Sequence, residues 1–591
     1  MAIILFIFYK FLFFFYDFLE IQRVSFYQFL KYQFRDELLF DKFTLKNQFY
    51  YNFIYNKYKF IRPKLNIKQS ILSSKTYCSN FYILVKFSYF KESQFQWVFL
   101  GTLPLLTRRG HFIINGIPRI MINQIVRSPG IYLKKKKRYS YYAEIIFQYG
   151  SWIRLEIDSK KKIWVSFQEI SQLPLEIFLK KFNQKYKDNI YFNNLFNSSD
   201  DEVHTFTKQN FILGKFGRLR LNQKLNICLN NLNLTPIDLI VISNYLYRSC
   251  EQLVDDIDNL KNRRLKTVGE LIQEQFARGL SRLREDFFSK KKKFDQIIKK
   301  SKSKNFNVLE NLIDLKVLNY ISINSTFKEF FHSHQLSQFL DQSNPLAEIT
   351  HKRRLSCLGS GGISTENASM EIRGIHRTHY GRICPIETPE GINAGLVNSL
   401  TISARKNFQG FLETPFVENY KQHSQYHKKI LFFCVEKQMS QNVFFNPILK
   451  KLKNLTVPVV KTHSQNQYNI DSINFWAFSP QQFISIGTNC IPFIEHNDAN
   501  RALMGSNMQR QSLPLLQIEK PIVNTINSFR VISDLRDIPI SNESGIIFYI
   551  SSKINKISYQ KIYGFYKNKK ILSLSKPNIY WLEKIFFNFS N

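Results

Sequence analysis

Apolar and polar residues alternate in several short stretches in the first third of the chain. Residues 111–118, HFIINGIP, and 119–125, RIMINQI, lie between glycine and proline turns, and three similar stretches follow, YYAEIIFQY, SWIRLEI and IWVSF. A period of two places successive side chains on opposite faces of a strand. The pattern predicts a mixed first domain that begins near Glu20 and continues to about residue 125, followed by an inserted domain that is at first rich in strands.

The pattern changes to helical spacing between residues 235 and 290. The stretches PIDLIVISNYLY and TVGELIQEQFARGLSRLREDFF carry apolar residues three to four positions apart, which predicts helices. The lysine runs at 290–293 and 299–304 surround few apolar residues and predict a surface insertion or a mobile loop. From Phe330 to Phe416, charged, glycine and proline residues are dense, which is typical of ordered loops around a site.

Two segments each have an alternative interpretation. The KKKKR run at 134–138 predicts a solvated hairpin tip or loop, with a DNA-facing role as the alternative. The opening MAIILFIFYKFLFFFYDF is apolar but contains Lys10 and Asp17, so its longest uncharged run is shorter than the ~20 residues that a membrane span requires. A buried or interface helix is therefore favoured over a membrane anchor.

The charge of the chain indicates what kind of partner it binds. The 591 residues include 83 lysines and arginines against 45 acidic residues, a net charge of +38. This excess predicts a polyanionic partner, with nucleic acid ahead of an anionic membrane surface. The seven cysteines form no CxxC pair, which argues against a zinc ribbon and a disulfide framework. The abundance of Phe, Tyr, Lys, Asn and Ile, whose codons are AT-rich, is typical of an organellar or otherwise AT-rich genome.

Carboxylates that could hold Mg²⁺ for phosphoryl transfer are few. The best cluster is Asp255-Asp256-Ile257-Asp258, but cations follow it directly, and a salt-bridged helix start is the favoured interpretation. The chain has no GxxxxGK[ST] phosphate loop. Two general-base pairs can be argued equally, His496 with Asp498 and His376 with His379. No self-contained active site and no metal site is predicted.

Residues suited to holding anions are prominent instead. Lys352, Arg353 and Arg354 run directly into a glycine-rich turn at residues 359–362. In EHNDANRALMGSNMQRQ, Arg501 and Arg510 stand nine residues apart among amide side chains. If this segment is helical, the two arginines lie about half a turn apart and face different partners.

Four motifs in order resemble the β subunit of bacterial-type multisubunit RNA polymerase. They are LSQFLDQSNPLAEITHKRRLSCLGSGGI, HYGRICPIETPEGINAGLVNSL, FLETPF and IPFIEHNDANRALMGSNMQRQ, and weaker matches extend the resemblance over about residues 20–550. The resemblance implies an α+β multidomain fold. Its expected parts are an N-terminal apolar extension (1–19), the first part of a protrusion (20–125), a lobe (126–288), a basic insertion and return to the protrusion (289–330), a fork (331–405), an external region (406–482) and the truncated start of a hybrid-binding region (483–591).

The resemblance also implies roles for individual residues. Arg501 would reach the phosphates of the incoming nucleotide. The nucleic-acid contacts would be Lys352, Arg353, Arg354, Glu390, Asn507, Arg510 and Gln511. The pocket that rifamycin-type inhibitors occupy would include Gln338, Phe339, Asp341, His351, Arg354, Ser356, Pro389, Asn393 and Val397.

The chain departs from the family pattern in the fork loop. Ser360 replaces the usual proline of Gly-Pro-Gly, and Ile363-Ser364-Thr365 follows where the family has Leu-Thr and an arginine. A basic contact to downstream DNA is therefore missing from this loop.

These features lead to one hypothesis for the whole chain. The resemblance implies the N-terminal part of a split β subunit, of the kind that some algal plastids encode, active in the chloroplast. Its partners would be the C-terminal β part, β′, α and sigma subunits, template DNA, RNA and ribonucleoside triphosphates, without a membrane. The chain would bind no cofactor itself, and Mg²⁺ would sit on β′. A non-catalytic nucleic-acid-binding protein and a membrane-anchored scaffold are the alternatives.

Overall fold

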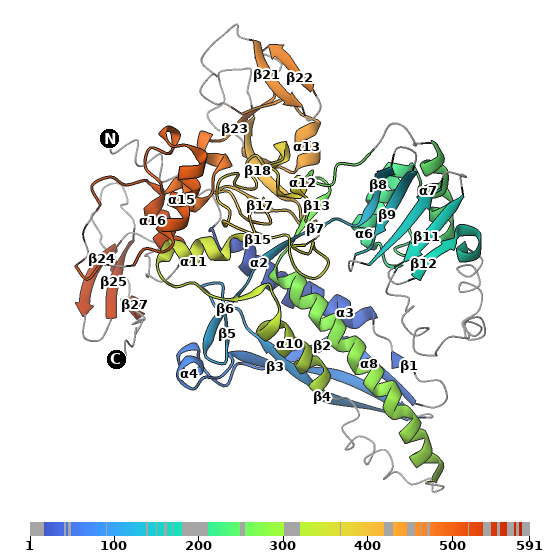
Figure 1. The fold of residues 1–591 in the computed structure, drawn as a ribbon. Coiled ribbons are helices and arrows are strands. Elements are labelled where there is room, and N and C mark those ends of the chain that lie inside the picture. Colours follow the sequence, from blue (N-terminus) through green and yellow to red (C-terminus); the bar gives the residue numbers. More distant parts are fainter. Residues whose placement is uncertain are drawn as a thin grey trace.

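A computed structural model describes residues 17–581 with gaps. The longest gaps are 180–210, 301–319, 419–429, 446–455, 536–544 and 564–572, and the remaining gaps span one to five residues. Figure 1 shows a central region with a strand-rich domain on its right, the β21–β22 hairpin above it and the C-terminal elements on its left. The chain combines several sheets with helices, as the predicted α+β class requires.

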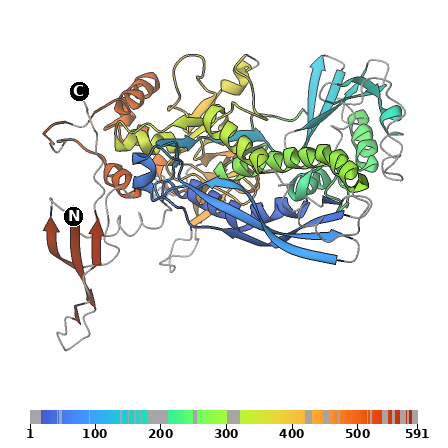
Figure 2. The same ribbon diagram turned by 90° about the horizontal axis from the view of Figure 1, so that it is seen from below.

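The first domain packs helices from three parts of the chain against one sheet. The sheet has the order β1-β2-β3-β4. Phe34 of α3 stacks on Phe276 of α8, with ring centroids 4.7 Å apart, and both rings also contact Phe81 of β3. Seen from below, α8 runs along this sheet (Figure 2). The elements are α2 (Glu20–Gln28), η1 (Phe29–Gln33), α3 (Phe34–Phe40), β1 (Phe43–Thr44), β2 (Phe49–Phe60), α4 (Ile67–Leu72), β3 (Cys78–Tyr89), β4 (Glu92–Pro104), α8 (Val268–Lys300) and α10 (Ile321–Ser333).

The alternating stretches at 111–125 form the predicted strands. They are β5 (Phe112–Ile114), β6 (Ile117–Met121) and β7 (Asn123–Arg127). Asn115 and Gly116 join β5 to β6, and both have positive φ angles, 52° and 79°. Asn-Gly is the preferred pair for such a two-residue hairpin turn, because both positions tolerate this backbone conformation.

The inserted domain is a five-stranded antiparallel sheet covered by two helices. The three alternating stretches after residue 140 lie in consecutive strands of this sheet, which confirms that prediction. The KKKKR run lies at a hairpin end as predicted, but its lysines belong to strand β8 rather than to a loop. The elements are β8 (Gly130–Lys137), β9 (Ser140–Ile146), β10 (Trp152–Ile157), β11 (Ile163–Phe167), β12 (Ile170–Pro174), α6 (Gly214–Leu225) and α7 (Pro236–Arg248).

The predicted helices at 235–290 are present, but the loop predicted at 290–293 is not. Helix α8 continues through that lysine run to Lys300. Lysine has a high helix propensity, and Phe294, Ile297 and Ile298 continue the three-to-four spacing. The second lysine run mostly lies outside the described residues.

A central sheet joins four distant segments of the chain. Its order is β13-β7-β15-β16, and β15 pairs with β7 in parallel and with β16 antiparallel. Helix α11 leads directly into β15. The elements around this sheet are β13 (Arg263–Lys266), β14 (Ser337–Phe339), α11 (Pro345–Lys352), β15 (Arg354–Ser356), α12 (Met370–Arg373), η5 (Arg377–His379) and β16 (Val397–Ser399).

The remaining elements form a second sheet and a set of C-terminal helices and strands. The sheet comprises β17 (Arg405–Lys406), β18 (Leu412–Glu418), β19 (Ile430–Phe433), β20 (Val443–Phe444) and β23 (Phe475–Ala477), with α13 (Val435–Met439) after β19 and the hairpin β21 (Thr456–Lys461) and β22 (Ser464–Asn469) beyond β20. The later elements are η8 (Pro480–Phe483), α14 (Ile486–Asn489), η9 (Ile494–His496), α15 (Ala499–Gln509), α16 (Asn527–Leu535), β24 (Gly545–Ser551), β25 (Lys556–Tyr563), β26 (Ser573–Leu574) and β27 (Asn578–Trp581). Among the described residues, no helix is both long and apolar enough to cross a membrane. The opening apolar segment, residues 1–16, lies outside them.

Candidate functional site

The three consecutive cations after α11 have different surroundings. Lys352 is 1% exposed and forms an ion pair with Glu348, one turn earlier on the same helix. Arg353 is 4% exposed, and its guanidinium donates to the carbonyls of Phe18, at 2.9 Å, and Thr401. Burial lowers the pKa of Arg353 to about 10. Both side chains form contacts within the chain, and their role as nucleic-acid contacts stays a prediction that this burial does not favour.

Arg354 is the cation of this run that remains available. It begins strand β15 and is half-buried. Within the described part of the chain, no group accepts a hydrogen bond from its guanidinium. Burial and then the neighbouring charge of Arg510 lower its pKa. The carboxylates of Glu387 and Asp341 offset this charge in part, and among the described residues the guanidinium of Arg354 still has hydrogen-bond donors free for an anion.

Helix α15 carries Arg501 in its first turn and Arg510 at its end, and the segment is helical, as was assumed for the spacing of the two arginines. Asp498 caps its N-terminus by accepting a hydrogen bond from Asn500 N at 3.2 Å. Arg501 is exposed in the first turn, whereas Arg510 ends the helix and is half-buried. The difference in exposure between Arg501 and Arg510 agrees with the interpretation that the two side chains face different partners. Gln511 is exposed directly after Arg510.

Sequence reasoning missed Glu387, which lies beside Arg510. Its side chain is 2% exposed, and its Oε1 lies 4.0 Å from Nε of Arg510. No described group donates a hydrogen bond to either carboxylate oxygen. Gly487 of α14 packs against this carboxylate, since a Cβ there would lie in ordinary contact, 3.4 Å from both oxygens. The available signal was a second glutamate three residues before Glu390 in the ETPE sequence.

Glu390 and Asn507 are joined to each other. Asn507 Nδ2 donates to Glu390 Oε1 at 3.3 Å, and Asn507 Oδ1 accepts from Nη2 of Arg510. The end of α15 is also fixed by Asn344, whose Nδ2 donates to the carbonyls of Gln509, Arg510 and Ser512 at 2.9–3.1 Å. Because Glu390 and Asn507 bond one another, their first role is within the chain.

Three residues of the predicted inhibitor pocket form one hydrogen-bonded group. His351 Nδ1 accepts from the backbone N of Asp341 at 3.2 Å, and its Nε2 lies 3.1 Å from Oε1 of Gln338. Burial, followed by the charge of Arg354, lowers the pKa of His351 to about 4. The ring is therefore neutral near pH 7, with the proton on Nε2. Phe339 beside them is 59% exposed and lies 4.3 Å from the guanidinium of Arg119.

The other predicted pocket residues gather around the β15–β16 pair. Ser356 is buried, pairs with Val397 across the two strands, and accepts a hydrogen bond from Leu358 N at 3.1 Å. Val397 N in turn donates to the carbonyl of Asn393 at 3.2 Å. Pro389 is half-buried in the same loop. Arg354 in β15 joins this group to the His351 group in sequence.

A cavity of about 930 Å³ lies between helices α8 and α10 and the loop at 358–365. Arg127, Arg278, Arg282 and His334 are among its lining residues, and Ile363, Ser364 and Thr365 line it from the loop. Three arginines thus line the cavity together with the loop that lacks a basic residue, and one of them, Arg282, pairs with Glu329.

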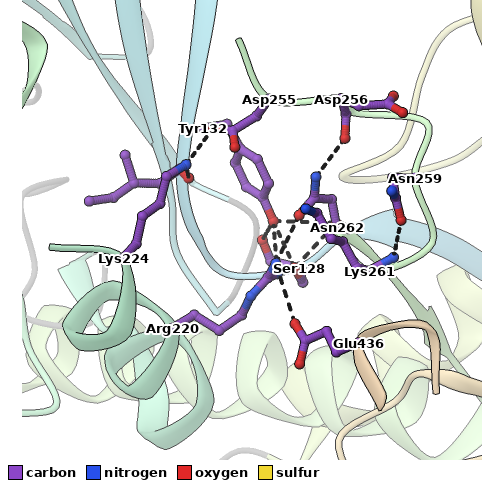
Figure 3. Close-up of polar contacts among 11 residues, drawn as sticks. Ser128, Tyr132, Arg220, Lys224, Asp255, Asp256, Asn259, Lys261, Asn262 and Glu436 are labelled. Carbon is purple, nitrogen blue, oxygen red and sulfur yellow. Dashed lines mark hydrogen bonds and ion pairs between the residues drawn. The ribbon is translucent and has the colours of Figure 1, made fainter. Parts of the chain in front are cut away.

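Each acidic residue of the 255–258 cluster contacts a basic side chain, and Figure 3 shows the contact of Asp255 with Lys224. Asp255 contacts Lys224 and accepts from Leu133 N at 2.7 Å, Asp256 pairs with His376 at 2.9 Å, and Asp258 pairs with Arg263. The predicted ion pairing is confirmed, but the predicted helix start is wrong, because the next helix begins at Val268. Across the described ranges, no group of three His, Cys, Asp or Glu side chains could hold a metal ion.

Neither histidine pair forms an evident catalytic centre. Burial, together with His376, lowers the pKa of His379 to about 3, and the Asp256 carboxylate lies against His376. His496 and Asp498 are exposed, and Asp498 serves as the cap of α15.

Comparisons with known proteins first define the class. The families described as "RNA polymerase Rpb2, domain 2" and "RNA polymerase Rpb2, domain 3" match residues 183–266 and 338–405. Two segments of the chain are thus similar to Rpb2 domains of RNA polymerase.

Longer relatives then define the family. A "DNA-directed RNA polymerase subunit beta N-terminal section" of Stigeoclonium helveticum is 34% identical over 93% of this chain and 99% of its own length. The section of the same name in Chlamydomonas reinhardtii is 33% identical over 91% of this chain and 84% of its own. The chain belongs to the β subunit family of DNA-directed RNA polymerase and corresponds to its N-terminal section. It spans about half of some undivided relatives, for example 46% of the Oltmannsiellopsis viridis subunit, which is 39% identical.

Proposed function

We propose that this chain is the N-terminal section of the β subunit in a plastid RNA polymerase, where it positions nucleic acid and the incoming nucleotide. The reaction is template-directed transfer of a nucleotide from a ribonucleoside triphosphate to RNA. The observation that carries the proposal is helix α15, which presents Arg501 at an exposed N-terminal turn and Arg510 beside Arg354 at its other end.

Arg501 would bind the triphosphate of the incoming nucleotide. It lies in the first turn of α15, where the helix dipole adds to its own positive charge. A planar guanidinium donates two parallel hydrogen bonds to phosphate oxygens, which fixes orientation as well as charge. The exposure of Arg501 leaves both edges of its guanidinium accessible.

Arg354, Arg510 and Gln511 would contact the backbone of the RNA–DNA hybrid. The first two are the neighbouring cations described above, and Gln511 is exposed next to them. The inhibitor pocket predicted from the family would be built from the His351 group and the β15–β16 group. The basic cavity beside the 358–365 loop would receive a further part of the nucleic acid.

Mg²⁺ would be held by another subunit. The carboxylates of the best acidic cluster among the described residues are occupied by contacts with Lys224, His376 and Arg263, and the cluster therefore does not suit the ion. We place the ion on β′ and expect the C-terminal β section, α and sigma as further partners. The role of this chain would be positional and electrostatic.

Reconstitution tests the proposal directly. The chain would be combined with the C-terminal β section, β′ and α of the same source, and RNA extension would be measured on a preassembled RNA–DNA scaffold. Extension should require the chain and should be absent with the chain alone. Extension by the isolated chain, or undiminished extension without it, would contradict the proposal.

A further inference from the structure

We propose that Glu387 and Glu390 are positioning residues, which hold Arg510 from two sides so that its remaining donors face a backbone phosphate of bound nucleic acid. The inference rests on the proposed function and assigns the carboxylates a role distinct from contact with the nucleic acid. Both glutamates belong to one short loop between η5 and β16, whereas Arg510 lies more than a hundred residues later at the end of α15.

Glu387 acts on Arg510 through charge. Its carboxylate is almost fully buried and lies 4.0 Å from Nε of Arg510, too far for a hydrogen bond but close enough for strong attraction in a poorly solvated site. A buried carboxylate that accepts no hydrogen bond from the described residues is costly. We infer that the charge of Glu387 offsets this cost by interacting with nearby cations. These cations are Arg510, Arg354 and Arg353.

Glu390 acts on Arg510 through Asn507. The amide of Asn507 donates to Glu390 and accepts from Nη2 of Arg510, so that its orientation is fixed from both sides. One edge of the guanidinium is therefore committed to Asn507, and Nε is directed to Glu387. No described group accepts a hydrogen bond from Nη1, which is left for a ligand.

The charge of the ligand follows from the surroundings. Burial and then the charge of Arg510 disfavour the charged form of Arg354, and the carboxylates of Glu387 and Asp341 oppose this in part. An anion between the two arginines would relieve both effects. Since the chain carries a net charge of +38 and belongs to a polymerase family, the phosphodiester backbone of an RNA–DNA hybrid is the anion that we assign.

Removal of the Glu387 charge gives a test that depends on sign. If Glu387 were only a negative charge near a polyanion, Glu387→Gln would tighten nucleic-acid binding. If Glu387 positions Arg510, the same change weakens binding, although the chain becomes more positive. Glu390→Ala provides a second variant at an exposed position, where the fold should tolerate the change.

The experiment measures binding of the purified full chain to a short RNA–DNA hybrid at several salt concentrations. Arg510→Ala should weaken binding about tenfold or more and reduce the salt slope by about one. Glu387→Gln and Glu390→Ala should each weaken binding by about two- to fivefold, with a smaller effect in the Arg510→Ala background, since residues that act through one partner are not additive. Glu371→Gln, an exposed change on α12, is the matched control and should bind as the parent does.

The outcomes separate the inference from the proposed function. If the parent chain fails to bind the hybrid, or Arg510→Ala binds as the parent does, the proposed contact fails and the inference fails with it. If Arg510→Ala weakens binding but both glutamate variants bind normally or more tightly, the proposed function stands and the positioning role is wrong. If Glu390→Ala weakens binding to the hybrid equally in the parent and in the Arg510→Ala background, the positioning role is also wrong.

Discussion

Two polar clusters of similar composition differ in how completely they are paired. At the junction of the inserted domain, Asp255 contacts Lys224, and Arg220 donates to Asn262 at 2.8 Å and also contacts Ser128 (Figure 3). At the end of α15, by contrast, Glu387 and Nε of Arg510 have no hydrogen-bond partner among the described residues. A satisfied network fixes the geometry of a fold, whereas buried charges without partners call for a further explanation such as a ligand.

The difference indicates which charges to examine for function. The acidic junction cluster attracted attention in the sequence because carboxylates are dense there, yet its partners are all internal. The α15 cluster has fewer carboxylates and a less conspicuous sequence. Four variants test whether hydrogen-bond pairing, rather than the density of charged residues, distinguishes a structural cluster from a functional one.

The largest effect is expected for Arg501→Ala on the functional side of the comparison. Loss of a charged hydrogen bond to the triphosphate should cost roughly 1.5–3 kcal/mol, which is about ten- to over a hundredfold in kcat/KM for nucleotide addition. Arg501→Lys should recover only part, because lysine keeps the charge but loses the planar fork. Single-nucleotide addition on a preassembled scaffold measures this, and parent-like rate and KM would remove Arg501 from the substrate site.

Arg220→Ala should affect stability rather than nucleotide use. It leaves Ser128, Tyr132 and Asn262, all buried, without their guanidinium donor. Unfilled buried acceptors should lower the free energy of unfolding by about 1–3 kcal/mol. Denaturant unfolding would show the loss, and Lys215→Ala, an exposed cation on the same helix, is the control. A parent-like stability together with a raised nucleotide KM would reverse the assignment of this cluster.

The pH dependence of stability tests the burial of His351, which is hydrogen-bonded to Asp341 and Gln338 next to Arg354. The folded pKa of His351 is lowered from 6.5 to about 4. Between these values the unfolded chain binds a proton that the folded chain does not, so stability falls as pH drops from about 6.5 towards 4. His351→Gln cannot titrate and should show a shallower fall. Identical pH profiles of the melting temperature in the two proteins would show that His351 is not buried in solution.

The smallest effect is expected for Lys135→Ala. Lys135 is exposed near the β8–β9 hairpin end. Its removal should lower salt-dependent DNA affinity slightly and leave nucleotide KM unchanged, since one solvated cation contributes little. A change in nucleotide KM comparable to that of Arg501→Ala would mean that exposure and distance from α15 do not separate the two regions.

The sequence by itself determined the local elements and the family. Alternation predicted the strands at 111–125, because a period of two depends only on neighbouring residues. The cap of α15 by Asp498 is likewise a local contact, since a cap bonds backbone groups within one turn, but from the sequence Asp498 was considered only as a partner of His496. The four ordered motifs were sufficient to identify the β family, which the matches of long relatives confirmed.

Only the tertiary structure decided which charges are buried and which remain available. Lys352, Arg353 and Arg354 are consecutive and chemically alike, yet the first two are internal because Glu348, Phe18 and Thr401 bind them. The pairing of Asp255 with Lys224 and the approach of Glu387 to Arg510 likewise join segments far apart in the chain. A local pair such as Lys352 with Glu348 can be predicted from neighbouring residues. Burial and the pairing of distant side chains depend on which segments meet, and local sequence patterns carry no information about that meeting.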